Sequence, residues 1–282
     1  MRLILSGKRI ETENKAFVMG IVNCTPDSFF SKSRGGIEIA KKMISEGADL
    51  LDIGGESTRP GSEYVSEEEE LSRILPVIKE IRKISSIPIS VDTRKKSVME
   101  EAWKNGADVL NDISALEDDS SLADFCAEKK LSVILMHKRG TPLTMQNNTG
   151  YKNAFDEVNA YLKTRADFAI KKGIPRENIL LDPGIGFGKG DDANRMLIAR
   201  CGSLCEGDFP VVMALSRKSC IGNITGRDVD ERLSGTLAAN LLSVISGATV
   251  LRVHDVKETV DSLRVYSALS SYTNFTCREE VL

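Results

Sequence analysis

The segment FVMGIVN, residues 17–23, is an apolar run that ends in a single amide side chain, Asn23. No polar residue interrupts it, so it predicts a strand buried on both faces rather than an alternating, half-exposed one. Strands of that kind belong to parallel sheets, whose two faces are covered. Seven further runs of similar character follow: Leu50–Ile53, Pro88–Val91, Val109–Leu110, Leu131–Met136, Ile179–Leu181, Val211–Leu215 and Val250–Val253.

Helical patterns fill the gaps between these runs. The clearest is SEEEELSRILPVIKEIRKI, residues 66–84, in which Ser66 and Glu69 form a capping box and apolar residues recur at helical spacing. Strands that alternate with helices, in units of roughly thirty residues, predict repeated βαβ units. A closed (β/α)8 barrel, the TIM-barrel fold, is the expected architecture, and a doubly wound sheet is the alternative.

The chain is expected to form a single α/β domain over residues 1–282, with the barrel at 16–275. No linker or low-complexity segment marks a second domain. Residues 1–15 precede the first buried strand. Within them, Leu3–Ile10 around Ser6 and Gly7 predicts a short β-hairpin that plugs the bottom of the barrel.

Composition narrows the classes of function. The 282 residues carry a formal net charge of −3, which gives no support for a nucleic-acid partner or an anionic membrane surface. No apolar run is long enough to span a membrane. The six cysteines form no C-x-x-C pair and the chain has only two histidines, which argues against a zinc site. Free thiols in the cytoplasm are expected instead.

Polar side chains stand at the carboxyl ends of the predicted strands, where barrel enzymes carry their catalytic residues. Each one alone also fits a helix N-cap, because Asp, Asn and Ser favour caps, and Asp112 and Asp255 fit that structural role best. The full set is harder to explain as caps, since buried carboxylates cost free energy unless they are paired. In chain order the set is Asn23, Asp52, Asp92, Asn111, Asp112, His137, Asp182, Lys218, Arg252, His254 and Asp255.

The chemistry of these strand ends divides into two sectors. Asp92, Asn111 and Asp182 offer acceptors and one amide, which suit a flat heterocycle with an amino-pyrimidinone edge. Lys218, Arg252 and His254 form a cationic cluster in the sector where barrels often bind phosphate, so neutralisation of an anion is the expected task. The alternative is that Arg252 and Lys218 are ion-pair partners of Asp182 or Asp52.

Two long loops follow the first two strands, NCTPDSFFSKSRGG at 23–36 and GGESTRPGSE at 54–63. Long βα loops in barrels are often lids. Thr58 and Arg59 are expected to reach an anion, Asn23 offers an amide oxygen to a Mg²⁺ that bridges phosphates, and Phe29 suits stacking on an aromatic substrate. Surface loops with incidental polarity are the alternative.

A third loop candidate, DPGIGFGK at 182–189, is rich in glycine. Its glycine spacing matches neither the dinucleotide fingerprint nor the P-loop. We therefore interpret it as a tight wall beside the ring-binding pocket rather than as a phosphate cradle.

Nine motifs run from about residue 18 to the last helix: NCTPDSFF, DIGGESTRPGS, SVDTRK, NDIS, LMHKRGTPLTMQ, DPGIGFGK, SRKSCIG, RLSGT and RVHDV. In this order and at this spacing they resemble the dihydropteroate synthase family. The resemblance implies a transferase of folate biosynthesis that joins 6-hydroxymethyl-7,8-dihydropterin pyrophosphate to para-aminobenzoate and releases pyrophosphate. It also implies a sulfonamide target, assistance by Mg²⁺, and a homodimer formed through the last helices.

The same resemblance implies the roles of individual residues. The pterin is expected to contact Asp52, Asp92, Asn111, Met136, Asp182 and Lys218. The pyrophosphate is expected to contact Asn23, Thr58, Arg59, Arg252 and His254, with Asn23 as the protein ligand of Mg²⁺. The para-aminobenzoate is expected to contact Phe29, Thr58, Pro60, Phe187 and Ser219. The catalytic contribution is expected from Lys218, Arg252, His254 and Asp92, without a covalent enzyme intermediate.

Two departures from the family pattern keep other functions open. The family usually continues Ser-Phe with Ser-Asp-Gly-Gly, whereas this chain has a longer and more basic segment at 30–36. It often has Gly where this chain has Ala214. The alternatives are a degenerate paralogue that binds pterin without turnover and a pterin-binding methyltransferase-type barrel. The latter would have no reason to keep Thr58-Arg59-Pro60.

Overall fold

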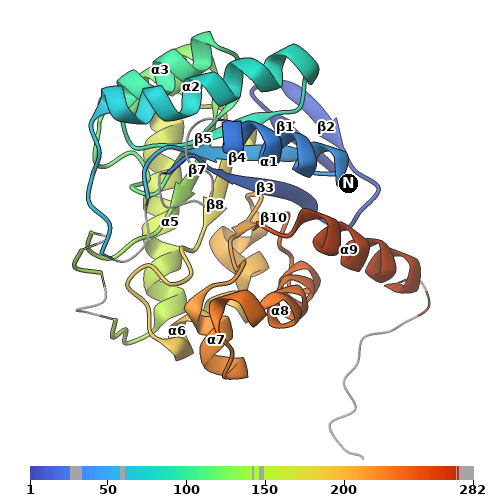
Figure 1. The fold of residues 1–282 in the computed structure, drawn as a ribbon. Helices are drawn as coiled ribbons and strands as arrows, with labels where there is room; N and C mark the ends of the chain where they lie inside the picture. Colours follow the sequence, from blue (N-terminus) through green and yellow to red (C-terminus); the bar gives the residue numbers. More distant parts are fainter. Residues whose placement is uncertain (26–33, 58–60, 142, 146–148, 271, 273–282) are drawn as a thin grey trace, which may run out of the picture.

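Eight parallel strands form the centre of the molecule, and helices surround them (Figure 1). The structure, a computed structural model, describes residues 1–25, 34–57, 61–141, 143–145, 149–270 and 272. The strands are hydrogen-bonded in the order β8-β7-β6-β5-β4-β3-β10-β9. Their bounds are β3 Phe17–Asn23, β4 Leu50–Gly54, β5 Ile89–Asp92, β6 Val109–Asp112, β7 Ser132–Met136, β8 Ile179–Asp182, β9 Val212–Met213 and β10 Val250–Val253.

The two edges of this sheet meet and close it into a barrel. The backbone N–H of Leu181 in β8 donates to the carbonyl of Pro210 at 2.9 Å, and Leu181 pairs in parallel with Val211, just before β9. The predicted (β/α)8 barrel is therefore confirmed, and the doubly wound sheet is excluded. The predicted run Val211–Leu215 forms only a two-residue strand, so closure depends on few contacts.

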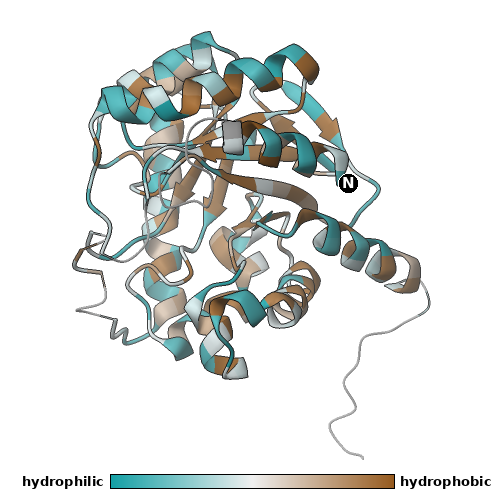
Figure 2. Ribbon diagram, in the orientation of Figure 1, coloured by the Kyte–Doolittle hydropathy of each residue, from teal (hydrophilic) through white to brown (hydrophobic). Residues whose placement is uncertain are grey.

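Helices cover the outside of the barrel and alternate with its strands. Their bounds are α1 Arg34–Ser45, α2 Glu67–Ile84, α3 Lys96–Lys104, α4 Ser121–Lys129, α5 Ala154–Lys171, α6 Asp191–Ala199, α7 Ser219–Thr225, α8 Leu233–Ile245 and α9 Val256–Ser270. Figure 2 shows apolar strands at the centre and helices with polar residues on their outward sides. One half of the predicted capping box opens α2, where the Ser66 hydroxyl accepts from the N–H of Glu69 at 3.2 Å. The Glu69 carboxylate accepts from Arg73 in the same helix.

The barrel has two apolar cores because its strands are buried on both sides. The larger one lies between the strands and the helices, and it includes Val18, Leu51 and Val91. The smaller one fills the lower half of the barrel itself. Its members are Leu3, Leu5, Phe17, Met19, Leu50, Val109, Ile134, Leu180, Val212 and Val250.

The predicted N-terminal hairpin supplies the base of this inner core. β1 (Arg2–Leu5) pairs antiparallel with β2 (Lys8–Glu11), and Leu3 and Leu5 point into the barrel. The connecting turn is fastened to the strand bottoms, since Ser6 N–H donates to the Ser132 hydroxyl at 2.8 Å and Ser132 N–H donates back to the Ser6 hydroxyl at 2.8 Å. The hairpin therefore plugs the amino-terminal end of the barrel, as predicted.

The predicted end of the barrel at residue 275 lies outside the described residues. No helix in the part of the chain that the structure describes combines the length and the apolar content needed to cross a bilayer.

Candidate active site

The barrel interior changes from apolar to charged at one level, above the inner core. Strand register brings the ends of neighbouring strands together: Asp92 of β5 lies opposite Asn111 of β6, and Met136 of β7 lies opposite Asp182 of β8. Asp52 of β4 lies slightly deeper and is fully buried. The predicted pterin-binding residues on β4 to β8 therefore share one layer at the carboxyl end of the barrel.

Arg252 of β10 ties this layer together. Its Nε donates to Oδ2 of Asp52 at 2.6 Å, and its Nη2 donates to Oδ2 of Asp92 at 2.9 Å. The amide of Asn111 donates to the same Asp52 oxygen at 3.1 Å. The alternative that Arg252 is an ion-pair partner of Asp52 is thus realised in this structure, and one cation holds two carboxylates from the neighbouring strands β4 and β5.

The carboxylates of this layer are not fully satisfied by the donors among the described residues. Oδ1 of Asp52 is buried and has no hydrogen-bond partner among the described residues. Burial raises the pKa of Asp92 against the attraction of Arg252, and burial likewise raises the pKa of Asp182 against that of Lys218. Such acceptors are stabilised by a ligand that brings N–H groups, because an unpaired buried acceptor costs about 1–3 kcal/mol.

Lys218 enters the layer from the turn before α7. Its neighbour Arg217 has a left-handed backbone, with φ of 58°, which is uncommon for a residue other than glycine. The fold maintains this conformation, since Arg217 pairs with Asp255 at 2.6 Å and its carbonyl accepts from Arg232 at 3.0 Å. Strained turns of this kind occur at functional sites, where they orient a neighbouring side chain.

The ammonium group of Lys218 faces the glycine-rich loop. It donates to the carbonyl of Ile185 at 2.5 Å and lies 5.0 Å from the centre of the Phe187 ring. Burial lowers the pKa of Lys218 to about 8, partly offset by Asp182. The alternative that Lys218 is ion-paired with Asp182 or Asp52 is not realised among the described residues, although Asp182 is near enough to attract its charge.

The loop 182–189 is the tight wall that the sequence predicted. A Cβ at Gly184 would lie 1.9 Å from the carbonyl oxygen of His137, so only glycine fits there. Gly184 N–H donates to Oδ1 of Asp182 at 2.6 Å, which fixes that carboxylate. Asn194 of α6 accepts from the N–H of Gly186 at 2.9 Å and steadies the centre of the loop.

Lys189 ends this loop and is a residue that the sequence reasoning missed. Its buried ammonium group donates to the carbonyls of Gly184 and Phe187 at 2.8 and 3.1 Å, and it lies 2.8 Å from Nδ1 of His137. Burial, together with the charge of Lys189, lowers the pKa of His137 to about 3. His137 is therefore a neutral brace for the loop, not a member of the site. The signal in the sequence that could have identified Lys189 was a single lysine directly after a loop with three glycines.

The other predicted residues take up distinct positions. His254 follows β10, and its Nδ1 lies 3.0 Å from the Ser216 hydroxyl. Ser219 is exposed at the start of α7. Asp112 is structural, as predicted, since it accepts from Ser114 and Leu116 backbone N–H groups at 2.7 Å, and Asp255 is the partner of Arg217. Four predicted residues lie outside the described ones: Phe29, Thr58, Arg59 and Pro60.

Asn23 completes the rim at the end of β3, next to Gly54 in the register. Its side chain is half-buried. Among the described residues, no cluster of three or more His, Cys, Asp or Glu side chains forms a metal cage. An amide oxygen at an open rim fits a Mg²⁺ that takes most of its ligands from phosphate and water, which is the usual mode of Mg²⁺ binding.

Comparisons with known proteins agree on the family. The family model described as pterin binding enzyme matches residues 19–254. The dihydropteroate synthase of Escherichia coli (strain K12) is 43% identical over 279 residues, which cover 96% of this chain and 97% of that protein. This chain belongs to the dihydropteroate synthases.

Solved structures of dihydropteroate synthases superimpose on nearly the whole chain. The Xanthomonas albilineans enzyme with 4-aminobenzoic acid has a TM-score of 0.89 at 42% identity, and covers 96% of this chain and 98% of its own. The Yersinia pestis enzyme in a sulfonamide drug complex has a TM-score of 0.90 at 36% identity, and covers 96% and 100%. As a dihydropteroate synthase, this chain is a transferase of folate biosynthesis. The match to dihydropteroate synthases over nearly the whole chain favours this family over the methyltransferase-type alternative.

Proposed function

We propose that this barrel condenses 6-hydroxymethyl-7,8-dihydropterin pyrophosphate with para-aminobenzoate as an active enzyme, not as a degenerate pterin-binding paralogue. The observation that carries the proposal is the layer of Asp52, Asp92 and Asp182, which is not fully satisfied by the donors among the described residues and stands beside Lys218 and Arg252. A donor-rich ring with an anionic tail complements both halves of that layer.

The pterin ring is proposed to bind inside the carboxyl end of the barrel. Its ring N–H and amino groups would donate to Asp92 and Asp182, and Asn111 would use the amide that now bonds Asp52. Met136, which is buried beside Asp182 in the register, would pack on the ring face. Lys218 would donate to the acceptor edge of the ring, since its ammonium group lies beside the carbonyl of Ile185 and is attracted by Asp182.

The pyrophosphate is proposed to lie at the rim between β10, β3 and the second loop. Arg252 and His254 approach from β10, Asn23 approaches from β3, and Thr58 and Arg59 belong to the β4–α2 loop. Asn23 would hold Mg²⁺ through its amide oxygen, and the ion when bound neutralises phosphate charge. The side chains themselves bind and orient the leaving group, which requires no covalent bond to the enzyme.

The para-aminobenzoate is proposed to bind against Phe187 and Ser219, with Phe29, Thr58 and Pro60 contributed by the two long loops. The amine lone pair forms the new C–N bond at the pterin methylene carbon. The C–O bond to pyrophosphate breaks, its electron pair leaves with the pyrophosphate, and the amine releases one proton. Holding the amine and the methylene in line, with water excluded, is the main contribution of the protein.

The test is pyrophosphate release by the purified protein given the pterin pyrophosphate and Mg²⁺, with and without para-aminobenzoate. We expect release that depends on the arylamine and falls at least about a hundredfold in Lys218→Ala and Arg252→Ala. Tight pterin binding without arylamine-dependent release would instead identify a degenerate paralogue. Arg176→Ala, which removes an exposed ion pair with Asp208, is the control and should keep its activity.

We also propose a homodimer and a cytoplasmic location. The outer faces of the neighbouring helices α8 and α9 expose apolar side chains, Leu242, Ile245, Val265 and Leu269. Contiguous exposed apolar residues of this kind favour a protein interface. Light scattering should give the mass of a dimer for the wild type and the mass of a monomer for Leu242→Glu.

The proposed cytoplasmic location is supported by the cysteines. The five described cysteines are free thiols, which suits a reducing compartment.

A further inference from the structure

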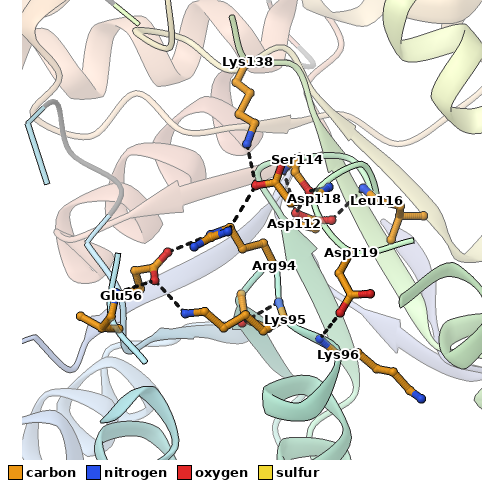
Figure 3. Close-up of polar contacts among 12 residues, drawn as sticks. Glu56, Arg94, Lys95, Lys96, Asp112, Ser114, Leu116, Asp118, Asp119 and Lys138 are labelled. Carbon is orange, nitrogen blue, oxygen red and sulfur yellow. Dashed lines mark hydrogen bonds and ion pairs between the residues drawn. The ribbon is translucent and has the colours of Figure 1, made fainter. Parts of the chain in front are cut away.

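A chain of charged side chains crosses the rim of the barrel beside the site just described (Figure 3). It includes Glu56 from the β4–α2 loop, Arg94 and Lys95 after β5, Asp118 after β6 and Lys138 after β7. None of these side chains belongs to the proposed pterin layer. The acidic end of the chain, Glu56, lies in the loop that carries Thr58, Arg59 and Pro60.

Glu56 is almost fully buried and accepts hydrogen bonds from three residues on two segments. Its Oε1 accepts from Nε of Arg94 at 3.1 Å. Its Oε2 accepts from Nζ of Lys95 at 2.8 Å and from the backbone N–H of Val65 at 3.1 Å. The contact with Val65 matters most, because Glu56 stands at the beginning of the β4–α2 loop and Val65 stands at its end, next to α2. One carboxylate thus joins both ends of the loop and attaches them to β5.

Three further contacts surround this junction. The Ser62 hydroxyl donates to the carbonyl of Ser57 at 2.6 Å, so residues 57 and 62 are also joined. The guanidinium of Arg94 stacks on the ring of Tyr64, 3.5 Å from its centre. Nη1 of Arg73 in α2 donates to the carbonyl of Gly55 at 2.6 Å. The base of the loop is therefore tightly constrained on both sides of residues 58–60.

The cations that hold Glu56 have second partners elsewhere. Lys95 also contacts Oε2 of buried Glu70 at 2.6 Å, and Arg94 also contacts Oδ2 of Asp118 at 3.6 Å. Loss of Glu56 would thus leave neither cation without a counter-charge, which limits the damage to the fold. Among these carboxylates, Glu56 alone holds the Val65 N–H, so its effect on the loop is separable from its effect on the charge balance.

We infer that Glu56 is a positioning residue for the arylamine half of the reaction: it joins the two described ends of the β4–α2 loop, at residues 56 and 65, to each other and to the segment after β5. This rests on the function proposed above. The carboxylate suits this task because it accepts a backbone bond and two charge-assisted bonds at once, and such bonds are about twice as strong as neutral ones. An uncharged or shorter side chain cannot satisfy all three donors.

The test compares Glu56→Ala and Glu56→Gln with the matched control Asp118→Asn. The control also deprives Arg94 of one carboxylate partner, but it touches no residue of the β4–α2 loop. Glutamine keeps the size of the side chain and one acceptor oxygen while removing the charge, so it guards against failure of the alanine variant to fold. Three quantities are measured: hydrogen exchange of the 55–66 backbone, KM for para-aminobenzoate, and Kd for the dihydropterin.

We expect exchange of the Val65 amide to become about tenfold faster in Glu56→Ala, in line with the strength of a hydrogen bond to a charged group. KM for para-aminobenzoate should rise about tenfold in that variant and less in Glu56→Gln, with dihydropterin Kd within about twofold of wild type. Asp118→Asn should match wild type in all three. Unchanged exchange over 55–66, or a loss of pterin affinity equal to the rise in KM, would overturn the inference.

The exchange measurement requires no turnover, so it separates the two hypotheses. Faster exchange in an enzyme without arylamine-dependent pyrophosphate release would defeat the proposed function while leaving the anchoring role of Glu56 intact. Normal turnover with unchanged exchange in Glu56→Ala would support the proposed function and defeat the anchoring role of Glu56.

Discussion

The two ends of the barrel interior are built from the same eight strands but follow opposite rules. The lower end is filled by Leu5, Phe17, Leu50 and their neighbours, and the hairpin seals it. The upper end holds Asp52, Asp92 and Asp182 around Arg252, and Oδ1 of Asp52 has no hydrogen-bond partner in the described part of the chain. The first arrangement stabilises the fold by burying apolar area, whereas the second costs stability because it desolvates charge.

This difference indicates how the molecule divides stability from function. A site that must accept a donor-rich ring needs acceptors that the protein itself leaves partly unsatisfied. The apolar half below supplies the rigidity that keeps those acceptors in place. Substitutions in the lower half should therefore change stability with little effect on substrate binding, while substitutions in the upper half should change both.

The largest effect should come from Arg252→Met. This change leaves Asp52 and Asp92 without their shared cation, so we expect unfolding free energy to fall by about 3–5 kcal/mol and pyrophosphate release to fall by at least about a hundredfold. Urea denaturation and the release assay measure the two quantities. Adding Asp52→Asn should recover part of the stability and none of the activity. A double variant no more stable than Arg252→Met would show that the ion pair is not the cause.

The second-largest effect is a loss of unfolding free energy in Leu5→Ala, a substitution in the lower half of the barrel. Leu5 is fully buried in the plug, and its truncation should lower unfolding free energy by about 3 kcal/mol through lost burial and a residual cavity. KM for both substrates should stay within about twofold of wild type. Ile4→Ala is the control, because Ile4 is 42% exposed on the other side of the same strand. An equal loss in both variants would contradict the plug as the source of stability.

The smallest effect is a pH dependence that belongs only to the upper half. The pKa of Lys218 is lowered from its ordinary 10.5 to about 8 by burial, so its charge is present below about pH 8 and is lost above it. We expect kcat/KM for the pterin pyrophosphate to decline above about pH 8, and Lys218→Arg to move that decline to higher pH. Initial rates measured from pH 6.5 to 10 check this.

Stability should change in the opposite direction in the same range. Between about pH 8 and 10.5 the unfolded chain binds more protons at Lys218 than the folded chain, so unfolding free energy should rise with pH there. Lys218→Met should lack this rise. A variant whose stability keeps the same slope would assign the effect to another group.

The sequence predicted the barrel well because its signals were local and repeated. Each apolar run such as Val18–Val22 is buried on both faces, and that condition alone indicates a parallel strand. The polar ends of the same runs predicted Asp92, Asn111 and Asp182 as one layer, since register places strand ends together. The strand β9 is shorter than predicted, because closure uses a single bridge at Val211 rather than a ladder. The strand β6 instead continues beyond the predicted Val109–Leu110 to Asp112.

The parts that the sequence did not predict depend on contacts between distant segments. His137 looked like a member of the site, but Lys189 turns it into a brace for the glycine-rich loop, and no local pattern shows that pairing. Arg217 was not singled out from the sequence, yet its left-handed backbone and its bond to Asp255 hold the turn beside Lys218. Side-chain partners of this kind are decided by three-dimensional packing, not by spacing.

The hairpin plug has a consequence for the order in which the chain folds. Ser6 is bonded to Ser132, 126 residues later, and Lys8 is bonded to Asp108, 100 residues later. Contacts of such sequence separation carry a high loop-closure entropy and form slowly. During synthesis the hairpin is made before residue 132, so it cannot form these bonds until β7 has been made.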